Sequence, residues 1–260
     1  MNTSSILQSV AAELHSARRL LFITGAGVSA DSGLPTYRGV GGLYNHEATE
    51  DGMEIEDALS GDCLVTHPEI TWKYLLQIRQ NCQAVLPNAA HRAIAALERT
   101  HEVVVLTQNI DGLHGQAGSS RVIEIHGNQA VRYCMRCHAP ADASDCGLPP
   151  RCACCGGVVR PGVVLFGESL PEAALMTLQE ELDQGFDMVF VIGTTAVFPY
   201  IAAPVMQAAR LGIPTVEINP ARTRLSSLVR YYVPLGAVEA FAVITGDVRN
   251  SEERSVRRQK

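Results

Sequence analysis

The chain contains five short, largely apolar runs that alternate with amphipathic stretches. The runs occupy 20–24, 103–107, 122–125, 187–192 and 215–218. Stretches with apolar side chains at helical spacing are interleaved with them, at 6–20, 89–98, 172–182 and 201–210. Continuous apolar runs of this length are typical of strands buried on both faces. Their alternation with helices predicts an α/β fold, in which helices cover both faces of a parallel sheet.

Two stretches, 39–86 and 131–157, lack this alternation of apolar runs and helical stretches. They predict a second and smaller lobe. The first has a helical pattern at 70–79, and the second holds most of the cysteines. Both are interpreted as insertions between sheet elements. The expected organisation is a large domain of 1–38, 87–130 and 158–249, a small domain of 39–86 and 131–157, and a mobile polar tail at 250–260.

Composition narrows the class of protein. With 260 residues, 47% of them hydrophobic, the chain can bury a proper core, which excludes collagen, coiled coil and disorder. The 21 Lys and Arg against 27 Asp and Glu give a net charge of -6, which does not favour nucleic acid as a partner. No run approaches the roughly 18 apolar residues of a membrane span, and the N-terminus has no secretory signal. We therefore expect a cytoplasmic protein with no membrane partner.

A glycine-rich turn follows the first run directly. Its sequence fits the dinucleotide-binding pattern G-x-G-x-x-A and reads Gly25-Ala26-Gly27-Val28-Ser29-Ala30. In such a motif Gly25 permits the tight turn, Gly27 lets the backbone approach a diphosphate, and Ala30 permits close packing. The acidic residue expected at a strand end about 20 positions later is missing, so an ordinary dehydrogenase half is not indicated. The motif alone also fits a structural turn.

Polar residues also follow the other predicted strands, at the sheet edge where open parallel sheets bind ligands. The loop Gly193-Thr194-Thr195 is small, bears hydroxyl groups and suits phosphate, and Asn219 follows a strand where a ribose can be held. Each loop alone also fits an ordinary strand-to-helix turn. Three such loops in one chain indicate a dinucleotide.

Two further strand ends carry groups suited to catalysis. Gln108-Asn109-Ile110-Asp111 follows one run, and His126-Gly127-Asn128 follows another. Amide and carboxylate side chains there suit a carboxamide and ribose hydroxyls, and His126 can act as a base near neutral pH. The alternative interpretation is that these are turn residues only.

Four of the eight cysteines have the spacing of a zinc site. Cys134-x2-Cys137 is followed by 14 residues and then by Cys152-x2-Cys155. Two such knuckles can close a tetrahedral thiolate cage around one Zn²⁺ per chain, and four thiolates leave no open position, so the metal is expected to be structural. In a cytoplasmic protein, clustered cysteines indicate metal before disulfides. The remaining cysteines are interpreted as spare thiols: Cys63, Cys82, Cys146 and Cys154.

The ordered set of these motifs resembles the sirtuins over roughly 20–240. The segments that carry the resemblance are GAGVSADSGLPTYR at 25–38, QNID at 108–111, HG at 126–127, the four cysteines, RPGVVLFGE at 160–168, GTT at 193–195 and EIN at 217–219. The resemblance implies an NAD-dependent protein lysine deacylase with a Rossmann-like large domain. It also implies a smaller lobe made of a zinc ribbon and a helical insertion.

The resemblance implies roles for individual residues. His126 and Asn109 are the implied catalytic residues, and the four cysteines are the implied ligands of structural zinc. NAD is the implied cofactor, and its expected contacts are Gly25, Ala26, Gly27, Ser29, Tyr37, Arg38, Gln108, Asn109, Ile110, Asp111, Gly193, Thr194, Thr195, Asn219 and Val238. An acylated-lysine protein or peptide is the implied partner, added as a strand between 163–168 and 197–200. Its expected contacts are Val163, Phe166, Gly167, Glu168 and Val197.

In the implied reaction the amide oxygen of the acyl-lysine attacks C1′ of the nicotinamide ribose as nicotinamide leaves. His126 then helps to deprotonate a ribose hydroxyl, and the products include free lysine and O-acyl-ADP-ribose. The pocket has to support developing charge and exclude water, and GVGG at 39–42 is a candidate closing loop. The alternatives are mono-ADP-ribosyl transfer, NAD hydrolysis and a non-catalytic NAD-sensing module.

The sequence departs from the usual sirtuin pattern at Tyr37, where the family has Phe, and at Leu165, where it has an aromatic residue. The branch that removes malonyl and succinyl groups carries a Tyr and an Arg three residues apart. The matching positions here are Leu75 and Ile78, so a buried carboxylate would lack its cation. We therefore expect neutral acyl substrates, acetyl or longer, and we expect a monomer.

Overall fold

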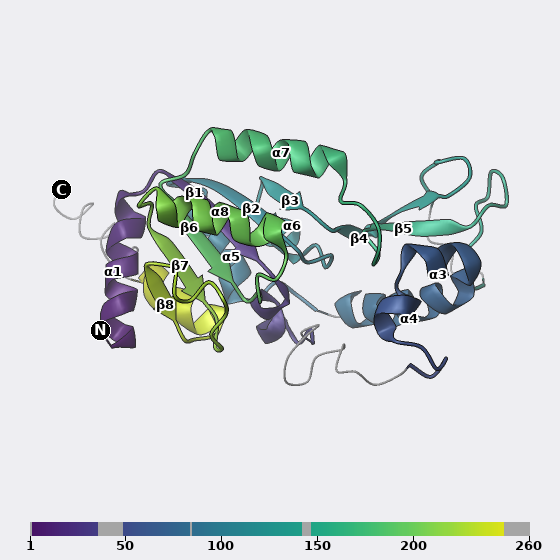
Figure 1. Cartoon of the computed structure of the whole chain (residues 1–260), viewed down its shortest axis with the longest axis horizontal. Coiled ribbons are helices and arrows are strands. Elements are labelled where there is room, and N and C mark those ends of the chain that lie inside the picture. Colours follow the sequence, from purple (N-terminus) through teal and green to yellow (C-terminus); the bar gives the residue numbers. More distant parts are fainter. Residues whose placement is uncertain (1, 36–48, 84, 142–146, 247–260) are drawn as a thin grey trace, which may run out of the picture.

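The large lobe is built on a six-stranded parallel sheet (Figure 1). The computed structural model describes residues 2–35, 49–83, 85–141 and 147–246. The strand order is β3-β2-β1-β6-β7-β8. The strands are β1 (Arg19–Thr24), β2 (Glu102–Thr107), β3 (Val122–Glu124), β6 (Met188–Ile192), β7 (Thr215–Ile218) and β8 (Tyr231–Val233). The parallel sheet predicted from the apolar runs is confirmed, and β8 is an additional strand that the runs did not reveal.

Helices cover both faces of the sheet because successive residues of each strand point to opposite sides. On one face Phe22 and Phe190 stack with ring centroids 4.7 Å apart, and on the other Leu21 and Val191 are buried. The covering helices are α1 (Thr3–Ser16), α5 (Ala89–Leu97) and residues 237–246 on the first face, and α7 (Glu172–Asp183) and α8 (Pro199–Arg210) on the second. Burial on both faces explains why the runs are continuous. None of the helices in the described ranges is long and apolar enough to cross a membrane.

The small lobe has a hydrophobic core of its own. Its elements are α2 (Ile55–Ala58), α3 (Gly61–Thr66), α4 (Pro68–Gln83) and an antiparallel pair of strands, β4 (Gly127–Cys134) and β5 (Val159–Val163). Trp72 is fully buried there, and its indole Nε1–H donates to the Val159 carbonyl at 2.8 Å, which ties α4 to β5. The predicted pairing of a helical insertion with a cysteine-rich segment is confirmed. β4 runs across the expected domain boundary at 130. β5, which pairs with it, lies wholly in the range 158–249 that was expected for the large domain. The domain boundaries stay a prediction.

The segments that follow the strands meet at one edge of the sheet. Backbone hydrogen bonds continue the ladder beyond the strand ends, from Gly25 N to Ile192 O, from Gln108 N to Thr24 O and from Gly193 N to Ile218 O, each at 3.0 Å. Carboxyl ends of parallel strands share an edge. The predicted site segments after β1, β2, β6 and β7 are therefore neighbours in space.

Candidate active site

The turn after β1 packs directly on the loop after β6. Gly27 N–H donates to the Gly193 carbonyl at 2.8 Å, and a Cβ atom on Gly27 would lie 2.6 Å from Gly193 Cα. Gly193 itself has a positive φ of 58°. The sequence predicted that Gly27 serves the approach of a diphosphate. Gly27 contacts a second loop, and its approach to a diphosphate stays a prediction. The turn continues as two short 3-10 helices, η1 (Ala26–Val28) and η2 (Ala30–Ser32).

Ser29, Asn109 and Asp111 form one hydrogen-bonded group although they come from two different loops. The Ser29 hydroxyl donates to Asp111 Oδ2 at 2.8 Å and accepts from Asn109 Nδ2 at 3.1 Å. Asp111 also accepts from the backbone N–H of Leu113, at the start of the short helix α6 (Leu113–Gln116). The network fixes the Asn109 amide so that its nitrogen faces Ser29.

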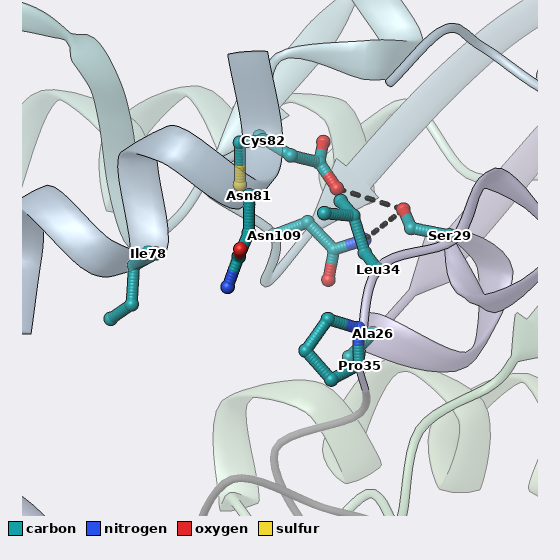
Figure 2. A pocket seen from close by; sticks show the side chains of 9 residues that line it. Ala26, Ser29, Leu34, Pro35, Ile78, Asn81, Cys82 and Asn109 are labelled. Atoms are coloured by element: carbon teal, nitrogen blue, oxygen red, sulfur yellow. Dashed lines mark hydrogen bonds between the residues drawn. The ribbon is translucent and has the colours of Figure 1, made fainter. Parts of the chain in front are cut away.

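A pocket opens beside this network (Figure 2). Asn109 is only 3% exposed, and its Oδ1 atom is buried without a hydrogen-bond partner among the described residues. Figure 2 shows this oxygen turned toward the open side of the pocket. The lining residues are Ala26, Ser29, Leu34, Pro35, Ile78, Asn81, Cys82, Asn109 and Asp111. A buried acceptor without a partner is costly, so the pocket suits a ligand that brings an N–H donor, such as a carboxamide.

Two buried histidines that sequence reasoning did not single out stand behind the pocket. His91 Nδ1 accepts from the Asn88 backbone N–H, so the neutral ring carries its proton on Nε2, which lies 3.5 Å from the Ser29 hydroxyl. Burial lowers the pKa of His91 to about 4 and that of His114, whose ring meets it edge-on, to about 3. Both rings are neutral at neutral pH. The available sequence signal was Asn88 three residues before His91, which forms a capping box at the start of α5.

Thr194 joins three of the predicted loops. Its hydroxyl accepts from Gln108 Nε2 at 2.8 Å, and its carbonyl accepts from Asn219 Nδ2 at 3.1 Å. Thr194 is buried, whereas Thr195 beside it is exposed. Val238 is half-buried in the first turn of helix 237–246. The predicted phosphate and ribose residues are thus brought together, partly by hydrogen bonds to one another.

His126 follows β3 and has a defined orientation. Its Nδ1 lies 2.9 Å from the Gln108 carbonyl, and its Nε2 lies 2.7 Å from the Tyr200 hydroxyl. A carbonyl only accepts, so Nδ1 carries the proton and Nε2 of the neutral ring holds the lone pair. Burial lowers the His126 pKa below its ordinary 6.5, and the Gln108 hydrogen bond opposes this shift. The ring is therefore a neutral imidazole with the protonation pattern of a base.

The residues of the predicted peptide-binding segments differ in burial and in whether they already have hydrogen-bond partners within the protein. The Glu168 carboxylate accepts from the two terminal guanidinium nitrogens of Arg160, at 2.6 and 2.8 Å, and from the Leu165 backbone N–H, so both of its oxygen atoms already have partners within the protein. Val163 is buried and Phe166 half-buried. Within the described ranges no backbone hydrogen bond involves Gly167 or Val197.

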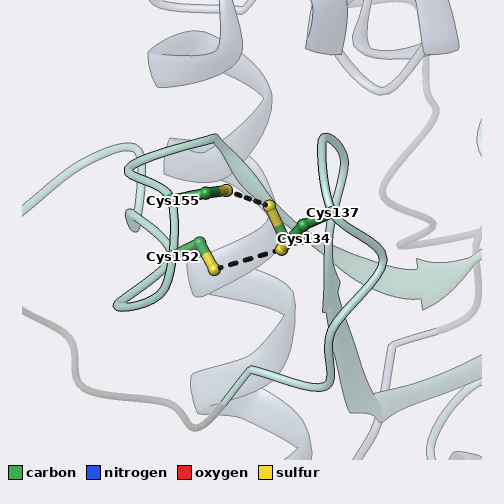
Figure 3. A group of neighbouring side chains, drawn as sticks. All are labelled: Cys134, Cys137, Cys152 and Cys155. Atoms are coloured by element: carbon green, nitrogen blue, oxygen red, sulfur yellow. Dashed lines mark hydrogen bonds between the residues drawn. The ribbon is translucent and has the colours of Figure 1, made fainter.

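The four predicted zinc ligands form one cluster (Figure 3). All four sulfur atoms lie within 4.8 Å of one another, with Cys134 and Cys155 at 3.4 Å and Cys137 and Cys152 at 3.7 Å. Sulfur atoms about 2.3 Å from a tetrahedral zinc ion are about 3.8 Å apart, so the donor set fits this metal. Cys154 is exposed and outside the group.

Several predicted residues lie outside the described residues. They are Tyr37, Arg38, the candidate closing loop at 39–42, Cys146 and the tail at 250–260.

Comparisons with known proteins agree with one another. A model of the Sir2 family matches residues 25–199. An NAD-dependent protein deacylase 2 of Pseudomonas aeruginosa is 54% identical over an alignment of 236 residues, and the match covers 88% of this chain and 92% of that protein. A solved complex of a mutant Sir2 homologue with ADP-ribose has a TM-score of 0.86 at 33% identity and covers 95% of this chain and 98% of its own. A Sir2 structure with a deacetylated p53 peptide and 3′-O-acetyl-ADP-ribose has a TM-score of 0.83 at 28% identity, with coverages of 93% and 98%.

Proposed function

The chain belongs to the Sir2 family, and from this premise we propose that it is an NAD-dependent deacylase of protein lysines in which His126 and Asn109 are the catalytic residues. The observation that carries the proposal is the neutral His126 ring, whose Nδ1–H is held by Gln108 while Nε2 keeps its lone pair. NAD supplies an electrophilic ribose carbon once nicotinamide begins to leave. His126 Nε2 takes the proton from a ribose hydroxyl, so that this oxygen can accept the acyl group.

The pocket of Figure 2 is proposed to hold the nicotinamide side of NAD. The unpaired Asn109 Oδ1 suits the N–H of the carboxamide, and the hydrogen bonds from Asn109 Nδ2 to Ser29 and Gly25 orient the amide. Gln108, Thr194 and Asn219 are proposed to meet the ribose and phosphate groups. Their mutual hydrogen bonds preorganise the edge before the dinucleotide binds.

The acylated peptide is proposed to add as a strand between Gly167 and Val197. The free backbone groups of both residues support this mode, since an added strand needs unpaired partners on each side. Val197 and Phe198 are 44% and 38% exposed and would give the peptide an apolar contact. The Arg160–Glu168 ion pair fixes the shape of the loop that carries Gly167.

The zinc cluster is proposed to have a structural role only. All four ligand positions are cysteine sulfurs, and Cys134 is buried in the small-lobe core. None of the described cysteines forms a disulfide bond, which supports the expected cytoplasmic location. The net charge of -6 supports the absence of nucleic acid among the partners, and a monomer is the proposed oligomeric state.

A panel of lysine peptides tests the proposed function. We expect nicotinamide release from NAD to require an acyl peptide, and kcat/KM for acetyl-lysine to exceed that for succinyl-lysine at least about tenfold. The chain has Leu75 and Ile78 at the positions where the branch that removes succinyl groups carries its Tyr and Arg, so a buried carboxylate would lack its cation. Release without peptide would favour NAD hydrolysis, ADP-ribose on the peptide would favour ADP-ribosyl transfer, and no release would favour an NAD sensor.

The pH dependence of deacylation follows from the burial of His126. A base acts in its neutral form, so activity is present above the His126 pKa and is lost as the pH falls through it. Because burial lowers this pKa, we expect the acid limb of kcat/KM to have its midpoint below 6.5. A pH–rate profile from about pH 5 to 8 measures it. A midpoint at or above 6.5 would contradict the assignment, provided that NAD binding is constant over the same range.

A further inference from the structure

Tyr200 is placed against the reactive face of His126. It is the second residue of α8, 74 positions after His126, and its hydroxyl lies 2.7 Å from His126 Nε2. Its ring stacks on Phe198 with centroids 5.4 Å apart and planes 13° apart. The planes of both rings are nearly perpendicular to the His126 imidazole. The ring centroids lie 5.9 Å from that of the imidazole for Tyr200 and 6.1 Å for Phe198. The phenol is thus held in place by aromatic packing as well as by its hydrogen bond.

The direction of this hydrogen bond follows from its neighbours. His126 Nδ1–H is committed to the Gln108 carbonyl, so Nε2 is an acceptor and the Tyr200 hydroxyl is the donor. Burial raises the pKa of Tyr200 to about 12, so the phenol keeps its proton at neutral pH. The lone pair that the reaction requires therefore accepts a hydrogen bond from Tyr200.

We propose that Tyr200 is a positioning residue that caps the base: its hydroxyl occupies His126 Nε2 until a ribose hydroxyl of NAD takes its place. The inference rests on the proposed role of His126. Nε2 has a single lone pair, so the phenol and the ribose hydroxyl cannot both donate to it. The cap keeps the ring oriented while the site is open, and its release costs about one ordinary hydrogen bond when NAD binds.

Tyr200→Phe tests the cap because it removes the hydroxyl and keeps the ring that stacks on Phe198. At saturating acetylated peptide, we expect the KM for NAD to fall about two- to tenfold, the range of one net hydrogen bond, with kcat within about twofold of the wild type. Tyr231→Phe is the matched control, since its phenol donates to Glu13 in the α1–β8 region, and it should leave both constants unchanged. An unchanged KM would overturn the proposal. So would a tenfold fall in kcat, which would indicate that Tyr200 relays the proton.

A second measurement does not depend on activity. The ¹⁵N resonances of the His126 ring in the ligand-free protein report its tautomer and the hydrogen bond at Nε2. We expect an Nδ1–H tautomer in both proteins, and Tyr200→Phe should move the Nε2 resonance toward that of a nitrogen accepting no hydrogen bond. Tyr231→Phe should not move it. An Nε2 resonance that Tyr200→Phe leaves in place would refute the cap, whereas the role of His126 itself is decided by its own replacement.

Discussion

Replacement of His126 by alanine is expected to reduce deacylation by about 10²- to 10⁴-fold, the usual contribution of a general base. Among the described residues, the variant loses the one imidazole at this edge that is neutral and oriented by a backbone carbonyl. NAD binding should stay within a few-fold, because the Asn109, Ser29 and Asp111 network does not include His126. Steady-state deacylation of an acetylated peptide and calorimetric titration with NAD measure the two effects separately.

The control for this variant is His15→Ala, which removes an exposed histidine from the last turn of α1. It should leave both deacylation and NAD binding unchanged. Wild-type deacylation by His126→Ala would refute the assignment of the base. A loss of NAD binding as large as the loss of activity would show that His126 acts in binding and not in proton transfer.

Replacement of Cys134 by alanine is expected to remove nearly all bound zinc and to unfold the small lobe. Cys134 is fully buried in the core of that lobe, and its sulfur lies 3.4 Å from that of Cys155. Binding of a structural zinc ion contributes about 10 kcal/mol or more to the free energy of folding of a small segment. We expect the apolar contacts of the small lobe to be too weak to compensate for its loss. Trp72 is the only tryptophan in the chain and is buried in the same core, so its fluorescence reports the loss directly.

Cys154→Ala provides the matched control for the zinc site. Cys154 is exposed and lies between two ligands in sequence, yet it is outside the four-sulfur group. Elemental analysis should give one zinc per chain for this variant and for the wild type. A full zinc content in Cys134→Ala, or its loss in Cys154→Ala, would show that the ligand set is wrong.

The large lobe could be predicted from the sequence because its strands are buried on both faces. Each of the five apolar runs corresponds to a strand, and the polar residues after them meet at one edge. β8 could not be found in this way, since it is three residues long and its two tyrosines are only half-buried. The antiparallel pair β4 and β5 was also not predicted, because Gly127–Cys134 has four half-buried and two exposed residues and no apolar run.

Local motifs identified the residues of the candidate site but not their partners. The four cysteines were found by spacing, since a tetrahedral cage restricts which spacings close. His91 and Tyr200 were missed because only the fold brings them to the site, where His91 contacts Ser29 and Tyr200 contacts His126. The ion pair between Arg160 and Glu168 was also missed, because no sequence pattern indicates that these two side chains meet. The substrate contact expected for Glu168 stays a prediction.

The contact between Gly27 and Gly193 also limits how the dinucleotide site can be redesigned. A side chain at either position would drive two main chains apart, because each glycine would place its Cβ within 2.6 Å of the other's backbone. Engineering of cofactor preference therefore cannot vary these positions one at a time. Diversity in a library has to come from residues whose side chains leave the interlocked turns untouched, such as the exposed Thr195.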